Sequence, residues 1–250
     1  MINRELSISL DLVRAIAAFS VFLSHFSYIG YTGTYTDFFH QYGHSGVVMF
    51  FVLSGYFIAY VCENKHDNFL DYMAARFARL YSVLLFALPL TFVLDTAGRN
   101  MSPHTYTTIP DSSPFAGALL NILFLQQGSF ISFKYLSNGP LWSLSYEFWY
   151  YVTFGCCYYL SGWKRYTCLT VLSLLIWPKI LLLMPCWLIG VFIYHLHKYG
   201  AARSWRYTLL TGISFSSFWF IASQENLIST LSSLPEIFGI NRSTLAYSQS

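Results

Sequence analysis

The sequence predicts an all-α fold, a polytopic bundle of about seven transmembrane helices with its N-terminus in the cytoplasm. Only 10% of the 250 residues are charged, against roughly 25% in an ordinary globular chain, and 55% are hydrophobic. The mean hydropathy is +0.47, and the apolar residues gather in runs long enough to cross a bilayer. The net charge of +3 is too small and too dispersed for a nucleic-acid groove, so we expect no nucleic-acid partner.

Seven stretches of mostly apolar residues approach the length of about 20 residues that a helix needs to cross a bilayer. They are residues 9–30, 44–62, 77–96, 140–160, 166–178, 183–197 and 205–223. The fifth and sixth are short and are separated by Pro178, Lys179 and Pro185, so we expect them to be broken or tilted. Between the third and fourth, the apolar residues 115–125 predict an interfacial or re-entrant helix.

The positions of the cationic residues favour a cytoplasmic N-terminus. Ten of the 14 Lys and Arg residues fall where this orientation places the inner side, and four fall on the outer side. Short cytoplasmic loops of membrane proteins carry such an excess. We therefore expect a multi-pass protein of the lipid bilayer, with residues 1–223 forming the embedded domain and residues 224–250 a polar tail.

The first expected span carries three ionisable residues, each of which is costly to place in lipid. Asp11 and Arg14 lie three residues apart and can pair on one helix face. Arg14 and His25 are eleven residues apart, so they point the same way, about 16 Å apart along the helix axis. In the simpler interpretation, Arg14 reaches the lipid headgroups and His25 bonds a neighbouring carbonyl group.

Glu147 lies in the aromatic segment LWSLSYEFWYY, at a depth in the fourth span similar to that of His25 in the first. A buried carboxyl group should be protonated or paired, because an isolated charge is expensive to desolvate. If Glu147 pairs with His25, it fixes the tautomer of the imidazole, which can then act as a general base. We therefore predict that His25 and Glu147 are the catalytic residues.

Other side chains near this level are candidates for binding a substrate. His44 begins the second span at the same boundary, and Trp142, Ser143 and Tyr150 flank Glu147. Each has a simpler explanation as well. An interfacial histidine can face water, a serine often bonds its own helix, and aromatic residues pack or form interfacial belts.

Arg76 and Arg79 lie one helical turn apart, on the side that the charge bias makes cytoplasmic. Two guanidinium groups so placed can bind a phosphate group, although a cationic anchor at the inner surface is the simpler explanation. Ser54 and Gly55 are small and predict a close approach between helices. The five cysteines lack the spacing of metal ligands, so we predict no metal site.

Four blocks of the sequence, in this order, resemble acyltransferase family 3, a family of integral membrane acyltransferases that modify cell-surface glycans. The blocks are DLVRAIAAFSVFLSHF at residues 11–26, FFVLSGYFI at 50–58, ARFARLY at 75–81 and LWSLSYEFWYY at 141–151. The resemblance implies transfer of an acyl group, most often acetyl from acetyl-CoA, to a hydroxyl group of a cell-surface polysaccharide. It also implies a location in the bacterial inner membrane.

The resemblance also implies roles for individual residues. Arg14 and His25 match the arginine and histidine regarded as essential in the family. Glu147 matches the glutamate of the fourth block. Arg76 and Arg79 match the arginines associated with the acyl-CoA end. With Arg14, they would bind the phosphates of the donor, whose long arm would then run outward to His25.

The chain departs from the family pattern in two respects. Val47, Val48 and Met49 stand where many members carry an acidic residue, so any role of that carboxylate is absent here. Members usually have more spans than are expected here, so we expect the domain of residues 1–223 to be incomplete at its C-terminal end. Two alternatives are a transporter of a glycan precursor or proton, since buried ionisable residues also form relays, and an inactive, truncated family member.

Overall fold

The computed structural model describes residues 4–27, 39, 43–65, 68–106, 113–127, 133–176, 178–200 and 211–215. Apart from turns and one isolated β-bridge, the regular structure in these ranges is helical, so the expected all-α class is confirmed. The helices are α1 (Arg4–Phe26), α3 (Gly43–Asn64), α4 (Phe69–Met101), α5 (Pro114–Ile122), α6 (Trp142–Tyr159), α7 (Gly162–Leu175) and α8 (Pro178–Lys198). The short 3₁₀ helices are η2 (Pro103–Tyr106) and η3 (Gly139–Leu141).

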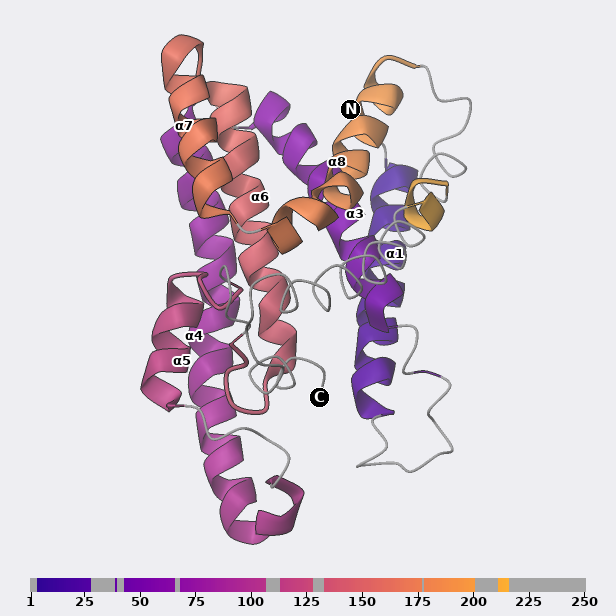
Figure 1. Cartoon of the computed structure of the whole chain (residues 1–250). Helices are drawn as coiled ribbons and strands as arrows, with labels where there is room; N and C mark the ends of the chain where they lie inside the picture. Colours follow the sequence, from indigo (N-terminus) through magenta and orange to yellow (C-terminus); the bar gives the residue numbers. More distant parts are fainter. Residues whose placement is uncertain are drawn as a thin grey trace, which may run out of the picture.

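The helices form two groups that meet along α3, α6 and α8 (Figure 1). In one group α1 packs on α3 and α3 crosses α8, while in the other α5 and α6 pack on α4 and α7 packs on α6. The chain runs up and down through the bundle. The ends of α1 and α4 therefore lie toward the same side of the molecule as the beginnings of α3 and α6 (Figure 1).

Two glycines allow α3 and α8 to cross at close range. A Cβ atom at Gly55 would overlap the carbonyl oxygen of Trp187, and a Cβ atom at Gly190 would overlap the carbonyl oxygen of Val52. No side chain fits between the two backbones, so this crossing requires glycine on both helices. The close approach expected at Gly55 is therefore confirmed.

The outward faces of the helices are strongly apolar. Phe19 and Phe22 of α1 and Leu85 and Phe86 of α4 are each at least 60% exposed. Stripes of large apolar side chains on this scale are unusual on a surface that faces water and are expected on one that faces lipid. Together with the length of the helices, they indicate an integral membrane protein.

Four of the described helices are long and apolar enough to cross a membrane, namely Leu6–Phe26, Ser45–Asn64, Phe69–Met101 and Ile180–Lys198. They correspond to the first, second, third and sixth expected spans. α6 covers the fourth with 18 residues, and α7 covers the fifth with 14 residues, which rise only about 21 Å. The seventh, residues 205–223, lies outside the described residues except for 211–215. The count of seven spans and the orientation stay predictions.

The boundary between α7 and α8 lies where a break was expected. α7 ends at Leu175 and α8 begins at Pro178, whose missing N–H and fixed φ suit the first turn of a helix. α8 then continues through Pro185, so this residue does not end a helix as the sequence had suggested. The helix expected at residues 115–125 forms as α5, with Ser113 Oγ accepting a hydrogen bond from the Ala116 N–H at 3.4 Å.

α4 is longer than the expected span of residues 77–96. Its N-cap is Asn68, whose Oδ1 accepts a hydrogen bond from the Asp71 N–H at 2.9 Å, and it extends for 33 residues. This is a rise of about 50 Å, against a hydrocarbon core of about 30 Å. Arg76 and Arg79 therefore lie within the first third of a continuous helix rather than in front of it.

Replacing Gly190 with alanine should loosen the crossing of α3 and α8, because the added methyl group overlaps the Val52 carbonyl oxygen. Overpacking of this kind costs about 1–3 kcal/mol. We expect a lower melting temperature of the detergent-solubilised protein, measured as loss of the monodisperse size-exclusion peak after heating. Gly139→Ala is the matched control, since a Cβ atom there meets nothing within 4 Å. Equal melting temperatures in the two variants would contradict the prediction.

Candidate active site

The polar residues of α1 lie along one side of a continuous helix. The expected ion pair is confirmed, with Arg14 Nη1 3.2 Å from Asp11 Oδ1. The Arg14 guanidinium also lies over the Phe57 ring of α3, 4.6 Å from its centroid. Because α1 is unbroken, His25 stays on the same side as Arg14, about 16 Å farther along the axis.

His25 lies in the last turn of α1 with an exposed side chain. α1 ends toward the side of the molecule on which α6 begins, which agrees with the similar depth expected for His25 and Glu147 (Figure 1). Within the described part of the chain, however, the side-chain contact of Glu147 is with Tyr151, and none joins Glu147 to His25. No hydrogen bond or ion pair in the described structure therefore joins the two predicted catalytic residues.

Glu147 is the end point of a hydrogen-bond chain that joins three helices. Trp187 Nε1 on α8 donates to Ser54 Oγ on α3 at 3.2 Å. The hydroxyl groups of Ser54 and Tyr151 lie 3.0 Å apart. Tyr151, on α6, donates to Glu147 Oε1 at 3.0 Å. Except for the half-buried Glu147, every member of this chain is buried.

The two ends of the chain determine its direction, because the Trp187 indole can only donate and the Glu147 carboxylate can only accept. Tyr151 gives its single hydroxyl proton to Glu147 Oε1, so it accepts the proton of Ser54, whose oxygen accepts from Trp187. The other carboxylate oxygen of Glu147, Oε2, has no hydrogen-bond partner among the residues described.

Arg76 and Arg79 approach the same tyrosine from α4. The Arg76 guanidinium lies 6.0 Å from the Tyr72 ring centroid and 5.9 Å from that of Tyr151. Its Nε is buried and has no hydrogen-bond partner in the described ranges. Arg79 is exposed and close enough to Tyr151 for an electrostatic interaction. The structure thus gathers Arg76, Arg79 and Glu147 around Tyr151. The sequence analysis had instead expected the arginines at the cytoplasmic end of the acyl donor and Glu147 at its outer, reacting end.

The other predicted substrate residues are engaged in packing. The half-buried Trp142 ring meets the Tyr146 ring edge-on at 5.0 Å, and Ser143 Oγ donates to the Pro140 carbonyl oxygen at 3.1 Å. Tyr150 is fully buried, and its hydroxyl donates to the Ile180 carbonyl oxygen at 2.9 Å. These contacts correspond to the simpler explanations given above. The side chain of His44 lies outside the described part of the structure.

A comparison with known protein families shows to which family the chain belongs. The model of an acyltransferase domain, that of acyltransferase family 3, matches residues 7–239. The chain belongs to acyltransferase family 3. The resemblance carried by the four sequence blocks is therefore confirmed, and the apolar helices agree with a location in a membrane.

Two similar proteins carry names that state an activity. The acyltransferase MdmB of Streptomyces mycarofaciens is 32% identical over 121 residues, which cover 47% of this chain and 29% of that protein. An O-acetyl transferase of Shigella phage Sf6 is 29% identical over 151 residues, which cover 58% of this chain and 44% of that protein. The matched part of this chain thus spans less than half of either relative. No solved structure matches the chain.

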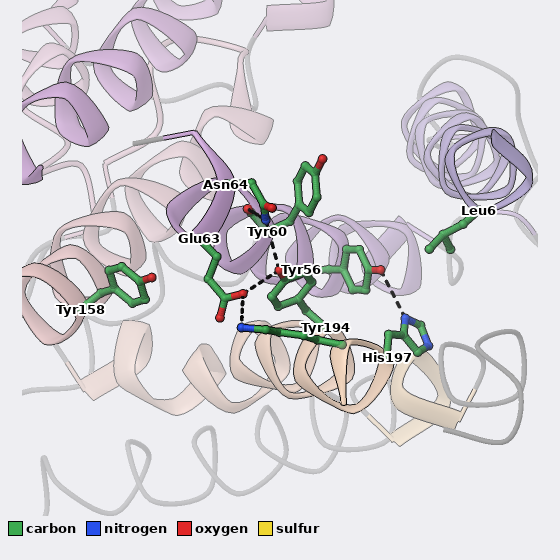
Figure 2. Close-up of a pocket in the computed structure, with 9 residues that line it drawn as sticks. Leu6, Tyr56, Tyr60, Glu63, Asn64, Tyr158, Tyr194 and His197 are labelled. Carbon is green, nitrogen blue, oxygen red and sulfur yellow. Dashed lines mark hydrogen bonds and ion pairs between the residues drawn. The ribbon is translucent and has the colours of Figure 1, made fainter. Parts of the chain in front are cut away.

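Sequence reasoning missed a second polar cluster, which lies between the ends of α3 and α8. Glu63 lies 2.7 Å from Lys198 Nζ and accepts a hydrogen bond from the Tyr194 hydroxyl at 2.8 Å. The hydroxyl oxygen of Tyr56 lies 3.2 Å from Nδ1 of His197 in the same pocket (Figure 2). The sequence did contain a signal for this cluster. The basic segment YHLHK at residues 194–198 ends one apolar run, and the acidic residue Glu63 ends another.

A buried carboxylate on α4 was also missed. Asp95 accepts hydrogen bonds from the Ser137 N–H at 2.8 Å and from the Ser137 hydroxyl at 2.6 Å. Burial raises the pKa of Tyr135 in the same loop, and the neighbouring Asp95 carboxylate raises it further. Asp95 therefore anchors the segment that leads into α6, the helix that carries Glu147.

Removing the Tyr151 hydroxyl should destabilise the bundle, because it leaves Ser54 and Glu147 without their shared partner. Loss of a buried partner typically costs about 1–3 kcal/mol. We expect Tyr151→Phe to lower the melting temperature in detergent, measured by differential scanning fluorimetry. Tyr166→Phe, at a 71% exposed position on α7, is the matched control and should melt like the wild type. A Tyr151→Phe protein as stable as this control would show that the chain contributes nothing.

Proposed function

We propose that the protein is an O-acyltransferase that moves an acetyl group from acetyl-CoA to a hydroxyl group of a cell-surface polysaccharide or related glycan. The observation that carries this proposal is the match of residues 7–239 to acyltransferase family 3. The relative named O-acetyl transferase supports the choice of acetyl and of an oxygen acceptor. The apolar helices support a membrane location, which we propose to be the bacterial inner membrane with the N-terminus inside.

The donor would be held by cations. Coenzyme A carries phosphate groups, and guanidinium groups bind phosphate oxygens through paired hydrogen bonds. The buried Nε of Arg76 has no acceptor among the described residues, as would suit a group that bonds an incoming anion. Arg79 and Arg14 would supply further positive charge to the phosphates. The thioester arm would then run along α1 toward His25.

The chemistry would take place at His25. The imidazole removes the proton of the acceptor hydroxyl, whose oxygen attacks the thioester carbonyl carbon. The tetrahedral intermediate collapses, the C–S bond breaks, and the imidazolium returns the proton to the departing thiolate of coenzyme A. Oε2 of Glu147 would orient the imidazole while Tyr151 holds the carboxylate through Oε1. Since no hydrogen bond joins the described side chains of Glu147 and His25, this pairing requires α1 and α6 to move closer together. Positioned bases typically contribute about 10²–10⁴ in rate.

Replacing His25 with alanine should abolish glycan acetylation, because no base remains to activate the acceptor hydroxyl. Acetyl esters on purified surface polysaccharide from expressing cells, measured by ¹H NMR, would report the loss. His104→Ala, at an exposed position in η2, is the control and should retain acetylation. Normal acetylation by a His25→Ala protein that is present in the membrane at wild-type level would refute the role of His25. Absence of acetyl esters with the wild type would instead favour a transporter or an inactive chain.

Replacing both Arg76 and Arg79 with alanine should weaken acetyl-CoA binding by about tenfold or more, since two charge-assisted contacts are lost. Equilibrium dialysis of the purified protein with radiolabelled acetyl-CoA would measure the change. Arg99→Ala combined with Lys134→Ala removes the same charge near the other end of α4 and should bind normally. Equal affinity in the two double variants would remove the arginine pair from the donor site.

A further inference from the structure

We propose that the pocket between the ends of α3 and α8 binds the nucleoside of the acyl donor, that is, its base and ribose. This inference rests on the proposed function, since it takes a coenzyme A thioester as the donor. It adds a separate subsite to the arginines and His25, built from residues to which no role has been assigned. The argument follows from the size, charge, surface chemistry and position of the pocket.

The pocket has a volume of about 510 Å³, within the range of roughly 300–1,000 Å³ that is typical of small-molecule sites. Four elements contribute to it, with Leu6 from α1 and Tyr158 from α6 at its edges. Figure 2 shows Tyr158 on one side and Leu6 on the other, with the side chains of α3 and α8 between them. The remaining lining residues are Tyr56, Tyr60 and Asn64 of α3 and Tyr194, His197 and Lys198 of α8.

The charges in the pocket are balanced by the protein itself. Glu63 lies 2.7 Å from Lys198 Nζ and 3.8 Å from His195 Nδ1, and it also accepts the Tyr194 hydroxyl proton. A wall of this kind suits an uncharged ligand that carries hydroxyl or amino groups, because the carboxylate can still accept hydrogen bonds. It does not suit a polyanion. The phosphate groups of the donor therefore belong outside this pocket.

The pocket also offers aromatic rings and polar atoms without hydrogen-bond partners among the described residues, which could bind a nucleobase and a ribose. Tyr60 is half-buried, Tyr158 is 43% exposed, and neither hydroxyl bonds another residue in the described ranges. Such rings stack on the faces of nucleobases. The Nε2 atom of His197 is buried and has no hydrogen-bond partner in the structure as described, so a ring nitrogen is left to recognise a base edge or a ribose hydroxyl.

The position of the pocket agrees with the order of groups in the donor. Leu6 of α1 lines the pocket, Arg14 follows about 12 Å along the same helix, and His25 follows about 16 Å beyond Arg14. A coenzyme A thioester has a nucleoside at one end, phosphates next to it, and the reacting carbonyl at the far end. The pocket, Arg14 and His25 therefore meet the three parts of the molecule in sequence.

The test compares a donor that has the nucleotide with one that lacks it. Kinetics with the purified full chain would use acetyl-CoA and S-acetylpantetheine, and equilibrium dialysis would measure binding of adenosine 3′,5′-bisphosphate. We expect Tyr60→Ala to raise KM for acetyl-CoA about five- to hundredfold with kcat unchanged, as loss of one stacking ring predicts. KM for S-acetylpantetheine should not change. Tyr60→Phe, which keeps the ring, should restore the wild-type KM.

Two further variants protect the result against misfolding. Tyr158→Ala removes an exposed ring of the pocket and should weaken adenosine 3′,5′-bisphosphate binding in the same direction, whereas Tyr166→Ala removes an exposed ring of α7 and should not. Unchanged acetyl-CoA kinetics in both pocket variants, or an equal rise in KM for the two donors, would overturn the proposal. A wild-type protein that uses neither donor would contradict the proposed function itself. One that uses both donors with the same KM would leave the function intact and exclude the nucleoside site.

Discussion

Gly55 and Gly190 allow the backbones of α3 and α8 to touch, and this contact fixes the register of every side chain that the two helices share. Beside the crossing, Ser54 meets Trp187, and the hydrogen-bond chain to Glu147 begins there. About two turns farther along α3, the same register brings the acidic side chain of α3 to the basic end of α8. A wider crossing would separate both pairs at once. The polar clusters around Glu147 and Glu63 therefore both depend on one steric contact between α3 and α8.

The low polarity of the bundle explains why these polar groups form chains. In a medium with little water, each hydroxyl, indole or carboxylate must find a partner in the protein or a ligand. Trp187, Ser54 and Tyr151 do so by passing one hydrogen bond to the next. Five buried side-chain atoms have no partner among the described residues, namely Arg76 Nε, Asn121 Oδ1, Gln126 Oε1, Thr153 Oγ1 and His197 Nε2. Two of the five, on Arg76 and His197, lie in the regions to which we assign parts of the acyl donor.

Features set by a single helix, and the close helix approach at Gly55, could be predicted from the sequence, whereas polar contacts between helices could not. The common side of Arg14 and His25 followed from their spacing, because α1 is continuous. The cost of burying a carboxylate pointed to Glu147 as a residue in need of a partner. The hydrogen bond of Glu147 with Tyr151 lies within α6, four residues along, so the spacing alone made this partner available. The pairing with His25 that we expected depends instead on how α1 lies against α6. The cluster around Glu63 was not predicted, because the residues that contact Glu63 are far from it in the sequence.

α1 is the least embedded of the four candidate spans. Only 17% of its apolar window is buried among the described residues, against 61% for that of α3, which it packs against. The helix that carries Arg14 and His25 is thus held mainly along one edge, and tilting it away would disturb few buried contacts. A long, lipid-like or partly apolar substrate could enter sideways from the bilayer past this helix, so access to His25 need not open through either aqueous end of the protein.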